Sequence, residues 1–354
     1  MGLQYSGTSE PATVLPQTAV TPVRSPMRSY SSHSWLAGAL FLSACAAPIP
    51  EEELAPRAFT QAPLAVDNGS DLNGSDLNGS DLNGSDLNGA ELNHFLVGVN
   101  FNPALKGGAL LDEAWLRGTS FYGYKGSTLY KDAEFVGVQF QGNLGDGSTV
   151  PVRITGMNPA PAPNADVNLY SIEYRATDGM WRPACRDVTG TPVQALPVEG
   201  VWNYRQNVEG GGSKTDDPQR FTFACMGGAI AKCALWGYRP WATYNGVPLA
   251  HYHQACTRMV RADYCGTGKS YTTTGNRINF YDELGIQQDT ESWVFEAEWD
   301  QNGARCFYGL NRTHEQLPCF DSRADLFCGQ NLSTHRGVLM RNETPGSLAI
   351  DLGL

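Results

Sequence analysis

Two glutamates near the end of the chain have the spacing of a carboxylate pair. Glu296 and Glu298 lie in the segment Trp293–Trp299, where apolar residues occupy every second position. On a β-strand, residues two apart share a face and lie about 7 Å from each other, a separation that suits the paired carboxylates of glycosidases. The alternative is the solvated face of an antiparallel strand. Glu296 and Glu298 are therefore the catalytic candidates, and the solvated face is the favoured interpretation.

A thiol and two imidazoles offer a second kind of chemistry. Cys265 together with His251 or His253 could supply a nucleophile and its base, but a disulfide is the favoured state of this cysteine. His251 and His253 could share a metal ion if they lay on a strand. The helical spacing around them places residues two apart on nearly opposite sides. We therefore expect no metal site here and predict that His253 packs at the edge of the core.

A glycine-rich stretch, Gly266–Ser270, resembles the end of a phosphate-binding loop. Such a loop needs a glycine at position 263, where this chain has Asp263, and an aspartate would repel phosphate. It also needs a following helix whose N-terminus faces the anion, whereas Tyr271–Gly275 is typical of a strand or turn. We therefore predict no nucleotide binding. No nucleophile elbow or zincin motif is present, and we expect neither a cofactor nor a metal.

Nine cysteines are the next signal, and eight of them follow Cys45. An even number in an exported domain predicts four disulfides, with 105 possible connectivities. Cys319 and Cys328 are close enough in sequence to close a local loop. Cys256 and Cys265 are predicted not to pair, because the rise of the intervening helix separates their Cα atoms by more than about 7 Å. Zinc is the competing interpretation, but the chain has no Cys-x-x-Cys pair. The predicted disulfide cysteines are Cys185, Cys225, Cys233, Cys256, Cys265, Cys306, Cys319 and Cys328.

The ninth cysteine follows an apolar stretch, Trp35–Leu42, which Arg28 precedes. This stretch is too short to span a bilayer, which takes about 20 apolar residues, and it has the size of a signal-peptide core. The string Leu42-Ser43-Ala44-Cys45 resembles the lipobox of bacterial lipoproteins. That resemblance implies that the Cys45 thiol carries lipid and that Cys45 is the mature amino terminus.

The same resemblance predicts where the protein resides. Residues 1–44 would form the signal region, with the true start at Met27, because the residues before Met27 do not fit a signal peptide. Ala46 follows the cysteine in place of an aspartate, which in enteric lipoproteins directs sorting to the outer membrane. We therefore expect a protein of the bacterial cell envelope that is held at the membrane by its lipid anchor.

An acidic, repetitive segment separates Cys45 from the remainder of the chain. Ser-Asp-Leu-Asn-Gly occurs four times from Ser70 to Gly89 and resembles the pentapeptide-repeat family, whose leucines stack inside a β-helix. One leucine in five cannot build a core, and so few copies would form little more than one coil. We therefore favour a flexible tether over residues 45–93. The segment holds much of the net charge of −11, and no basic patch that would indicate nucleic acid binding is visible.

From residue 94 onward the pattern changes to a folded domain. Apolar alternation bounded by Gly, Pro, Asn and Asp predicts short antiparallel strands. Two helices are expected, over Gly228–Trp236 and over the apolar face from Leu249 to Val260. The fold class that we predict is α+β, with mostly short antiparallel strands, two helices and disulfide staples. The clearest strand segments are 95–99, 134–141, 150–154, 170–174, 221–224 and 293–299.

The string Ala262-Asp263-Tyr264-Cys265, together with segments around 224–241 and 296–306, resembles the ADYC domain family. The resemblance covers about residues 180–330, preceded by a β-rich part over 94–179 and followed by a C-terminal segment, 331–354. The family is a bacterial domain of unknown function that often occurs on lipoproteins, and it therefore implies no activity. Within the motif we predict that Asp263 accepts backbone hydrogen bonds at a helix end, Tyr264 pins a loop and Cys265 locks the corner.

These features favour a binding or structural module over an enzyme. A lipid anchor, a tether and disulfides together are typical of a protein that contacts cell-wall glycans or other envelope proteins, and no catalytic signature is present. The alternative is an extracytoplasmic hydrolase that acts on a polysaccharide or another polymer through Glu296 and Glu298.

Overall fold

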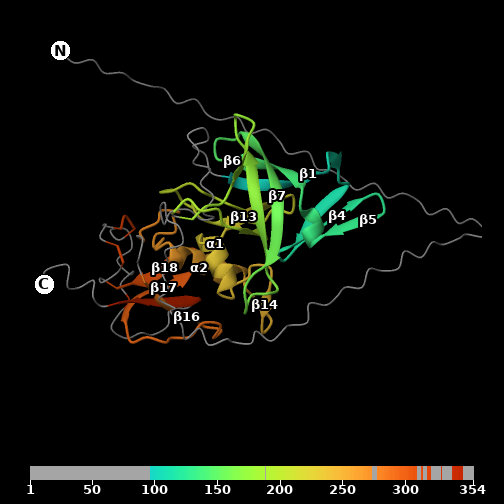
Figure 1. Cartoon of the computed structure of the whole chain (residues 1–354). Coiled ribbons are helices and arrows are strands. Elements are labelled where there is room, and N and C mark those ends of the chain that lie inside the picture. Colours follow the sequence, from blue (N-terminus) through green and yellow to red (C-terminus); the bar gives the residue numbers. More distant parts are fainter. Residues whose placement is uncertain are drawn as a thin grey trace, which may run out of the picture. The chain divides into compact units, whose positions relative to one another are not determined.

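The computed structural model describes residues 96–187, 189–272, 277–308, 312–313, 317–319, 328 and 337–345 (Figure 1). The predicted signal region, Cys45 and the repeat-bearing tether lie outside these residues.

Six strands form a closed antiparallel barrel. They follow one another in the order β10–β13–β1–β6–β7–β8, and the pairing of Ala195 with Tyr170 joins β10 back to β8. Inward residues such as Val150, Val152 and Ile154 alternate with outward ones, as predicted for this segment. The barrel strands are β1 (Leu96–Lys106), β6 (Val138–Leu144), β7 (Thr149–Pro159), β8 (Asn168–Arg175), β10 (Ala195–Glu199) and β13 (Arg220–Cys225). At the edges β2 (Ala109–Leu110) pairs with β1, and β9 (Trp181–Pro183) pairs with β8.

A three-stranded antiparallel sheet contributes one face to the core of the barrel. It consists of β3 (Glu113–Arg117), β4 (Ser120–Lys125) and β5 (Thr128–Lys131), followed by the 3-10 helix η1 (Asp132–Phe135). Phe121 of β4 is fully buried, and its ring lies 5.1 Å from both Tyr170 and Phe221. These close aromatic contacts attach the sheet to the barrel.

The two α-helices are α1 (Ala229–Leu235) and α2 (Ala250–Val260), and both confirm the predicted segments. A disulfide between Cys233 and Cys256 joins them. Helix α2 packs against β17 in a second antiparallel sheet, in which Met259 and Trp299 share one buried cluster. The strands of this sheet, in spatial order, are β16 (Asn279–Asp282), β19 (Met340–Thr344), β17 (Val294–Asp300) and β18 (Gly303–Phe307). Two short hairpins complete the structure, β11 (Val201–Trp202) with β12 (Lys214–Thr215) and β14 (Thr243–Tyr244) with β15 (Val247–Pro248).

The balance of elements corrects the predicted fold class. The two helices and the antiparallel strands are present, but the α-helices hold only 7 and 11 residues, and the fold is mostly β instead of a balanced α+β. The strand predicted over 134–141 begins only at Val138. Gly137 has a φ of +91°, a value that glycine adopts readily, and it separates η1 from β6.

All eight cysteines after Cys45 form disulfides, which confirms the predicted number. The pairs are Cys185–Cys225, Cys233–Cys256, Cys265–Cys319 and Cys306–Cys328. The prediction that Cys256 and Cys265 do not pair is confirmed. The local loop between Cys319 and Cys328 is wrong, because the backbone N–H of Cys328 donates to the carbonyl of Phe307, which places this cysteine beside Cys306 of β18.

Candidate functional site

The residues that follow α2 form a tight corner around one buried aspartate. Ala262 has a φ of +53°, so the chain turns directly after the helix. The carboxylate of Asp263 then accepts hydrogen bonds from the backbone N–H groups of Thr267, at 3.0 Å, and Gly268, at 2.9 Å. The predicted role of Asp263 as a backbone acceptor at a helix end is confirmed.

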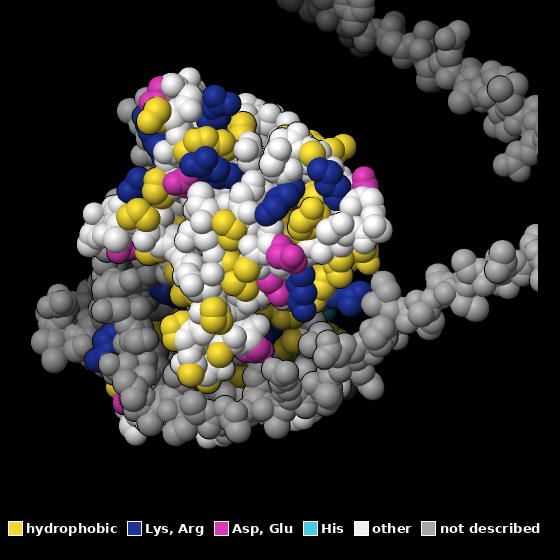
Figure 2. Space-filling model, turned by 45° about the vertical axis from the view of Figure 1, so that its right-hand side comes forward, with side chains coloured by type: hydrophobic (Ala, Val, Ile, Leu, Met, Phe, Trp, Pro, Cys, Tyr) yellow, Lys and Arg dark blue, Asp and Glu magenta, His cyan; other side chains and the backbone are white. Residues whose placement is uncertain are grey.

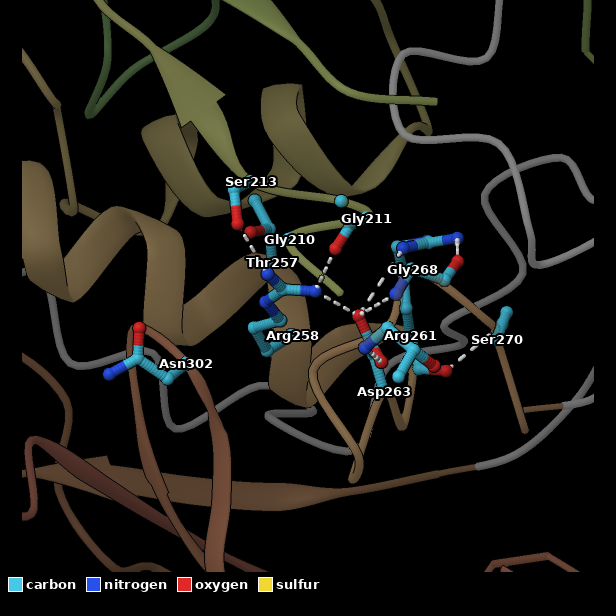
Figure 3. A network of polar contacts seen from close by, with 12 residues as sticks. Gly210, Gly211, Ser213, Thr257, Arg258, Arg261, Asp263, Gly268, Ser270 and Asn302 are labelled. Carbon is cyan, nitrogen blue, oxygen red and sulfur yellow. Dashed lines mark hydrogen bonds and ion pairs between the residues drawn. The ribbon is translucent and has the colours of Figure 1, made fainter. Parts of the chain in front are cut away.

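Asp263 also balances the charge of a buried arginine. Arg258 of α2 is 2% exposed, Asp263 is 0% exposed, and the two form an ion pair. In Figure 3 one terminal nitrogen of the Arg258 guanidinium contacts both Asp263 and the carbonyl of Gly211, and the other donates to the hydroxyl of Ser213. Arg258 thereby ties the end of α2 to the loop between β11 and β12. A second guanidinium, that of Arg261, lies 3.9 Å from the same carboxylate.

This corner gives a physical reason against a phosphate loop at Gly266–Ser270. In such a loop, backbone N–H groups point at the anion. Here the N–H groups of Thr267 and Gly268 donate to the chain's own carboxylate, on Asp263. A phosphate would have to displace that carboxylate from two hydrogen bonds and an ion pair.

The neighbouring tyrosine anchors a strand instead of the loop that we predicted. The hydroxyl of Tyr264 donates to Glu296 Oε1 at 2.5 Å, and Arg312 Nε donates to the same oxygen at 3.0 Å. Burial, with the nearby Glu296 carboxylate, raises the pKa of Tyr264 well above its ordinary value. The ring of Tyr264 also stacks on Trp299, with 5.2 Å between centroids. The motif tyrosine therefore fastens α2 to β17.

The solvated face predicted for Glu296 and Glu298 is wrong. The two residues are 0% and 1% exposed. Strand β17 is covered on both sides, and bulges beside Phe295 and after Glu298 interrupt its alternation. Glu298 accepts a hydrogen bond from Arg341 Nε of β19 at 3.1 Å, and Glu296 is paired with Arg312. Both carboxylates are thus held in ion pairs.

A cavity of about 590 Å³ opens beside the motif corner. Its wall includes the buried guanidinium of Arg258 and the disulfide of Cys265 and Cys319, and neither Glu296 nor Glu298 reaches it. The remaining lining residues come mainly from three loops, and most of them are polar: Asn207, Glu209, Gly210, Ser213, Gly266, Thr267, Asn302 and Pro318. The structure therefore brings Cys265 to a solvent-accessible hollow and places the glutamate pair elsewhere.

The cavity leads us to expect that one disulfide is reduced before the other three. Cys265 and Cys319 are both partly exposed, whereas the other six cysteines are between 0% and 7% exposed. An attacking thiolate must reach a sulfur atom for exchange to occur. In the folded protein, limiting dithiothreitol followed by alkylation and peptide mass spectrometry should label Cys265 and Cys319 about tenfold faster than the others. In urea the four pairs should react at similar rates, and earlier labelling of Cys185 or Cys225 would contradict this expectation.

The two histidines of α2 lie on different sides of the helix, as predicted. His251 is exposed and His253 is fully buried. His253 Nε2 lies 3.0 Å from the carbonyl oxygen of Ile230, which can only accept, so this nitrogen carries the proton. Burial lowers the pKa of His253 to about 4. The ring therefore sits in the core as a neutral side chain.

This buried imidazole predicts a loss of stability in acid. The unfolded chain takes up a proton near the ordinary histidine pKa, while folded His253 resists protonation until about pH 4. The contribution of neutral His253 to stability is therefore complete above about pH 7 and falls by about 3 kcal/mol between pH 7 and pH 4. Denaturant unfolding of His253→Gln should lack this part of the acid loss. The exposed variant His251→Gln should keep it, and equal acid losses in all three proteins would refute the assignment.

The sequence did not lead us to predict that the loop between β11 and β12 completes the site. Gly211 and Ser213 contact Arg258 although more than 40 residues separate them in the chain. The available signals were the run Gly210-Gly211-Gly212 and an arginine next to the apolar Met259 and Val260 in the last turn of α2. Gly212 has a φ of +72°, and a Cβ there would lie 2.8 Å from the Arg258 guanidinium. Only glycine fits this approach of the loop to the arginine.

Two negative observations apply to the described part of the chain. No three His, Cys, Asp or Glu side chains within it are grouped as they would be around a metal ion. None of its helices combines the length and the apolar character that crossing a membrane requires.

Comparison with known families gives two matches. The model of the ADYC domain matches residues 132–313, just over half of the 354 residues. The match starts in η1 and includes most of the barrel, whereas the motif resemblance alone had suggested a start near residue 180. A model described as pentapeptide repeats (8 copies) matches residues 68–95. No curated protein and no solved structure matches the chain.

Proposed function

The chain belongs to the ADYC domain family, and we propose that this domain is the ligand-binding part of an exported, lipid-anchored envelope protein. The observation that carries the proposal is the cavity of about 590 Å³ beside the family motif. Its volume lies within the range of sites for small organic ligands, about 300–1,000 Å³. The motif aspartate holds the arginine of the cavity wall in place, so the family motif maintains the shape of the site.

The four disulfides support export. Disulfides persist in oxidising compartments and are rare in the cytosol, and every cysteine after Cys45 is paired. A lipid on Cys45, as the lipobox resemblance implies, would hold the domain at the membrane, with the repeats as a spacer. Mass spectrometry of the membrane fraction should detect an acylated peptide that begins at Cys45. Recovery of a soluble protein that begins upstream of Cys45 and carries no lipid would overturn this part of the proposal.

The lining of the cavity indicates the ligand class. Asp263 neutralises Arg258, so the wall offers hydroxyl and amide groups from Ser213, Thr267 and Asn302, together with the carboxylate of Glu209, rather than a free positive charge. Such groups exchange hydrogen bonds with the hydroxyl and acetamide groups of a sugar. We therefore take a short N-acetylated glycan, of the kind found in bacterial cell walls, as the ligand.

Calorimetry of the mature protein in nonionic detergent with N-acetylglucosamine oligomers tests the proposal. We expect saturable binding that is lost in Asn302→Trp, because a large ring at this exposed position would fill the cavity. The matched control is Thr149→Trp, an exposed position on barrel strand β7, and it should bind as the unmodified protein does. Absence of binding, or equal binding by Asn302→Trp, would refute the cavity as a glycan site.

A hydrolase is the less favoured function. General acid and base catalysis requires carboxylates within reach of the substrate. Glu296 and Glu298 are buried and paired with arginines, and neither borders the cavity. A binding module fits these positions better than an enzyme that uses this pair.

A further inference from the structure

The outer side of the three-stranded sheet β3–β4–β5 carries a row of aromatic rings, which we call the aromatic face. It consists of Trp115, Tyr122 and Tyr124, all partly exposed. The centroid of Trp115 lies 5.7 Å from that of Tyr122 and 5.5 Å from that of Tyr124. The alternate residues of the same strands, such as Phe121, point into the barrel core. The core therefore does not need these three rings, and their surface faces solvent.

Two cations flank the aromatic face. The guanidinium of Arg117 lies 5.4 Å from the ring centroid of Tyr122, and the ammonium of Lys131 lies 5.1 Å from the same centroid. Arg117 is exposed, and no ion pair with a carboxylate is found for it among the described residues, whereas Lys131 pairs with Asp132 at 3.9 Å. The charge of Arg117 is held over a ring and is open to an anion from outside. Figure 2 turns toward the viewer the side of Figure 1 on which β4 and β5 lie, and shows Lys and Arg side chains interspersed with hydrophobic ones and with some Asp or Glu side chains.

We propose that the aromatic face binds an acidic polysaccharide, at a site separate from the cavity. The ring faces of Trp and Tyr carry partial negative charge and attract the partly positive C–H groups of a pyranose ring. A sugar carboxylate beside those rings would pair with Arg117, whose guanidinium can donate two parallel hydrogen bonds to it. Uronic acid polymers present both features on each sugar. The face lies at residues 113–131, outside the family match, which begins at residue 132.

A polysaccharide fits this face better than a lipid bilayer does. The three rings lie within a sheet and are partly covered by one another, so they offer a shallow surface and cannot insert into a bilayer. Attraction to anionic lipids also needs a clear excess of cations. Here Glu113 lies at one end of the face, opposite Tyr124 in the strand register, and offsets part of the charge of Arg117 and Lys131.

Native affinity electrophoresis of the mature protein in nonionic detergent tests the proposal, with alginate in the gel as the probe. We expect retardation by alginate that weakens with salt, and little retardation by neutral dextran. Tyr122→Ala and Trp115→Ala should weaken the alginate affinity by about tenfold. Arg117→Gln should remove the preference for alginate over dextran. The control Trp181→Ala removes a second partly exposed tryptophan that stacks with an arginine, Arg153, outside this sheet, and it should change nothing.

Three outcomes would overturn the proposal. Equal retardation by alginate and dextran would show that the cations do not contribute to binding. Unchanged alginate affinity in Tyr122→Ala and Trp115→Ala, with unchanged unfolding midpoints, would remove the role of the rings. The third is contact with lipid, tested with protein held by its anchor in phosphatidylglycerol vesicles that contain brominated acyl chains. Fluorescence quenching that disappears in Trp115→Phe would place the face on the bilayer. N-acetylglucosamine oligomers probe the cavity, whereas alginate probes the aromatic face. The result for the cavity therefore does not determine the result for the aromatic face.

Discussion

Replacement of Asp263 by alanine should destabilise the domain by about 3–5 kcal/mol. Asp263 is the counter-ion of buried Arg258, lies near the charge of Arg261 and accepts two backbone hydrogen bonds. Removal of one partner from a buried ion pair costs about 3–5 kcal/mol, because the remaining charge stays in the protein interior without compensation. Such a loss is a large fraction of the whole stability of a typical domain, about 5–15 kcal/mol.

The free energy of urea unfolding, measured with the disulfides intact, gives the test. Asp263→Asn keeps the shape and one acceptor but loses the charge, so it should fall between the unmodified protein and Asp263→Ala. The control is Asp178→Ala, which removes a solvent-exposed ion pair with Arg182 and should cost about 1 kcal/mol or less. A loss below about 1 kcal/mol in Asp263→Ala would mean that Asp263 does not compensate the buried charge of Arg258.

Elements with a regular period of apolar residues were predictable from the sequence. Strand β7 alternates because only its inner face lines the barrel, so the period of its apolar residues reports the geometry of burial directly. The apolar residues of helix α2 recur at helical spacing, with Tyr252, Cys256 and Met259 in one buried cluster. The period there predicts the helix but not its full burial, because the polar residues between them, such as Gln254 and Arg258, are buried as well.

Strand β17 shows where that reasoning fails. Its glutamates follow the pattern of a solvated face, yet they are buried with arginines supplied by distant parts of the chain. Arg312 lies 16 residues from Glu296, and Arg341 lies 43 residues from Glu298. A polar residue in an alternating pattern looks the same whether water or a buried arginine faces it. Sequence periodicity alone cannot distinguish the two.

The closure of the barrel and the pairing of the cysteines could not be predicted from the sequence either. The pairing of β10 with β8 that closes the barrel has a single register pair, Ala195 with Tyr170. The link between Cys265 and Cys319 spans 54 residues, and nothing in their spacing distinguishes it from the other connectivities. The cysteine count predicted how many disulfides form, whereas the folded chain determines which cysteines meet.

The buried ion pair of Glu296 and Arg312, to which Tyr264 adds a hydrogen bond, should show a much stronger coupling than an exposed ion pair. Each residue is at most 1% exposed, and Arg312 also donates to the carbonyl of Met259 at 2.6 Å. Burial opposes the charge of Arg312, but Glu296 and Tyr264 raise its pKa above the ordinary value. Glu296→Gln should therefore cost about 3–5 kcal/mol, because it leaves the guanidinium buried without its carboxylate.

A double-mutant cycle separates this charge effect from lost packing. Arg312→Met alone should be about as harmful as Glu296→Gln, since it leaves a buried carboxylate, while the double variant should recover about 2 kcal/mol or more of the summed losses. The control cycle uses Arg153→Met and Glu173→Gln, a partly exposed pair on the barrel, with an expected coupling of about 1 kcal/mol or less. Additive losses at Glu296 and Arg312 would show that the two charges do not stabilise each other. A Glu296→Gln protein of normal stability would return this glutamate to the catalytic candidates.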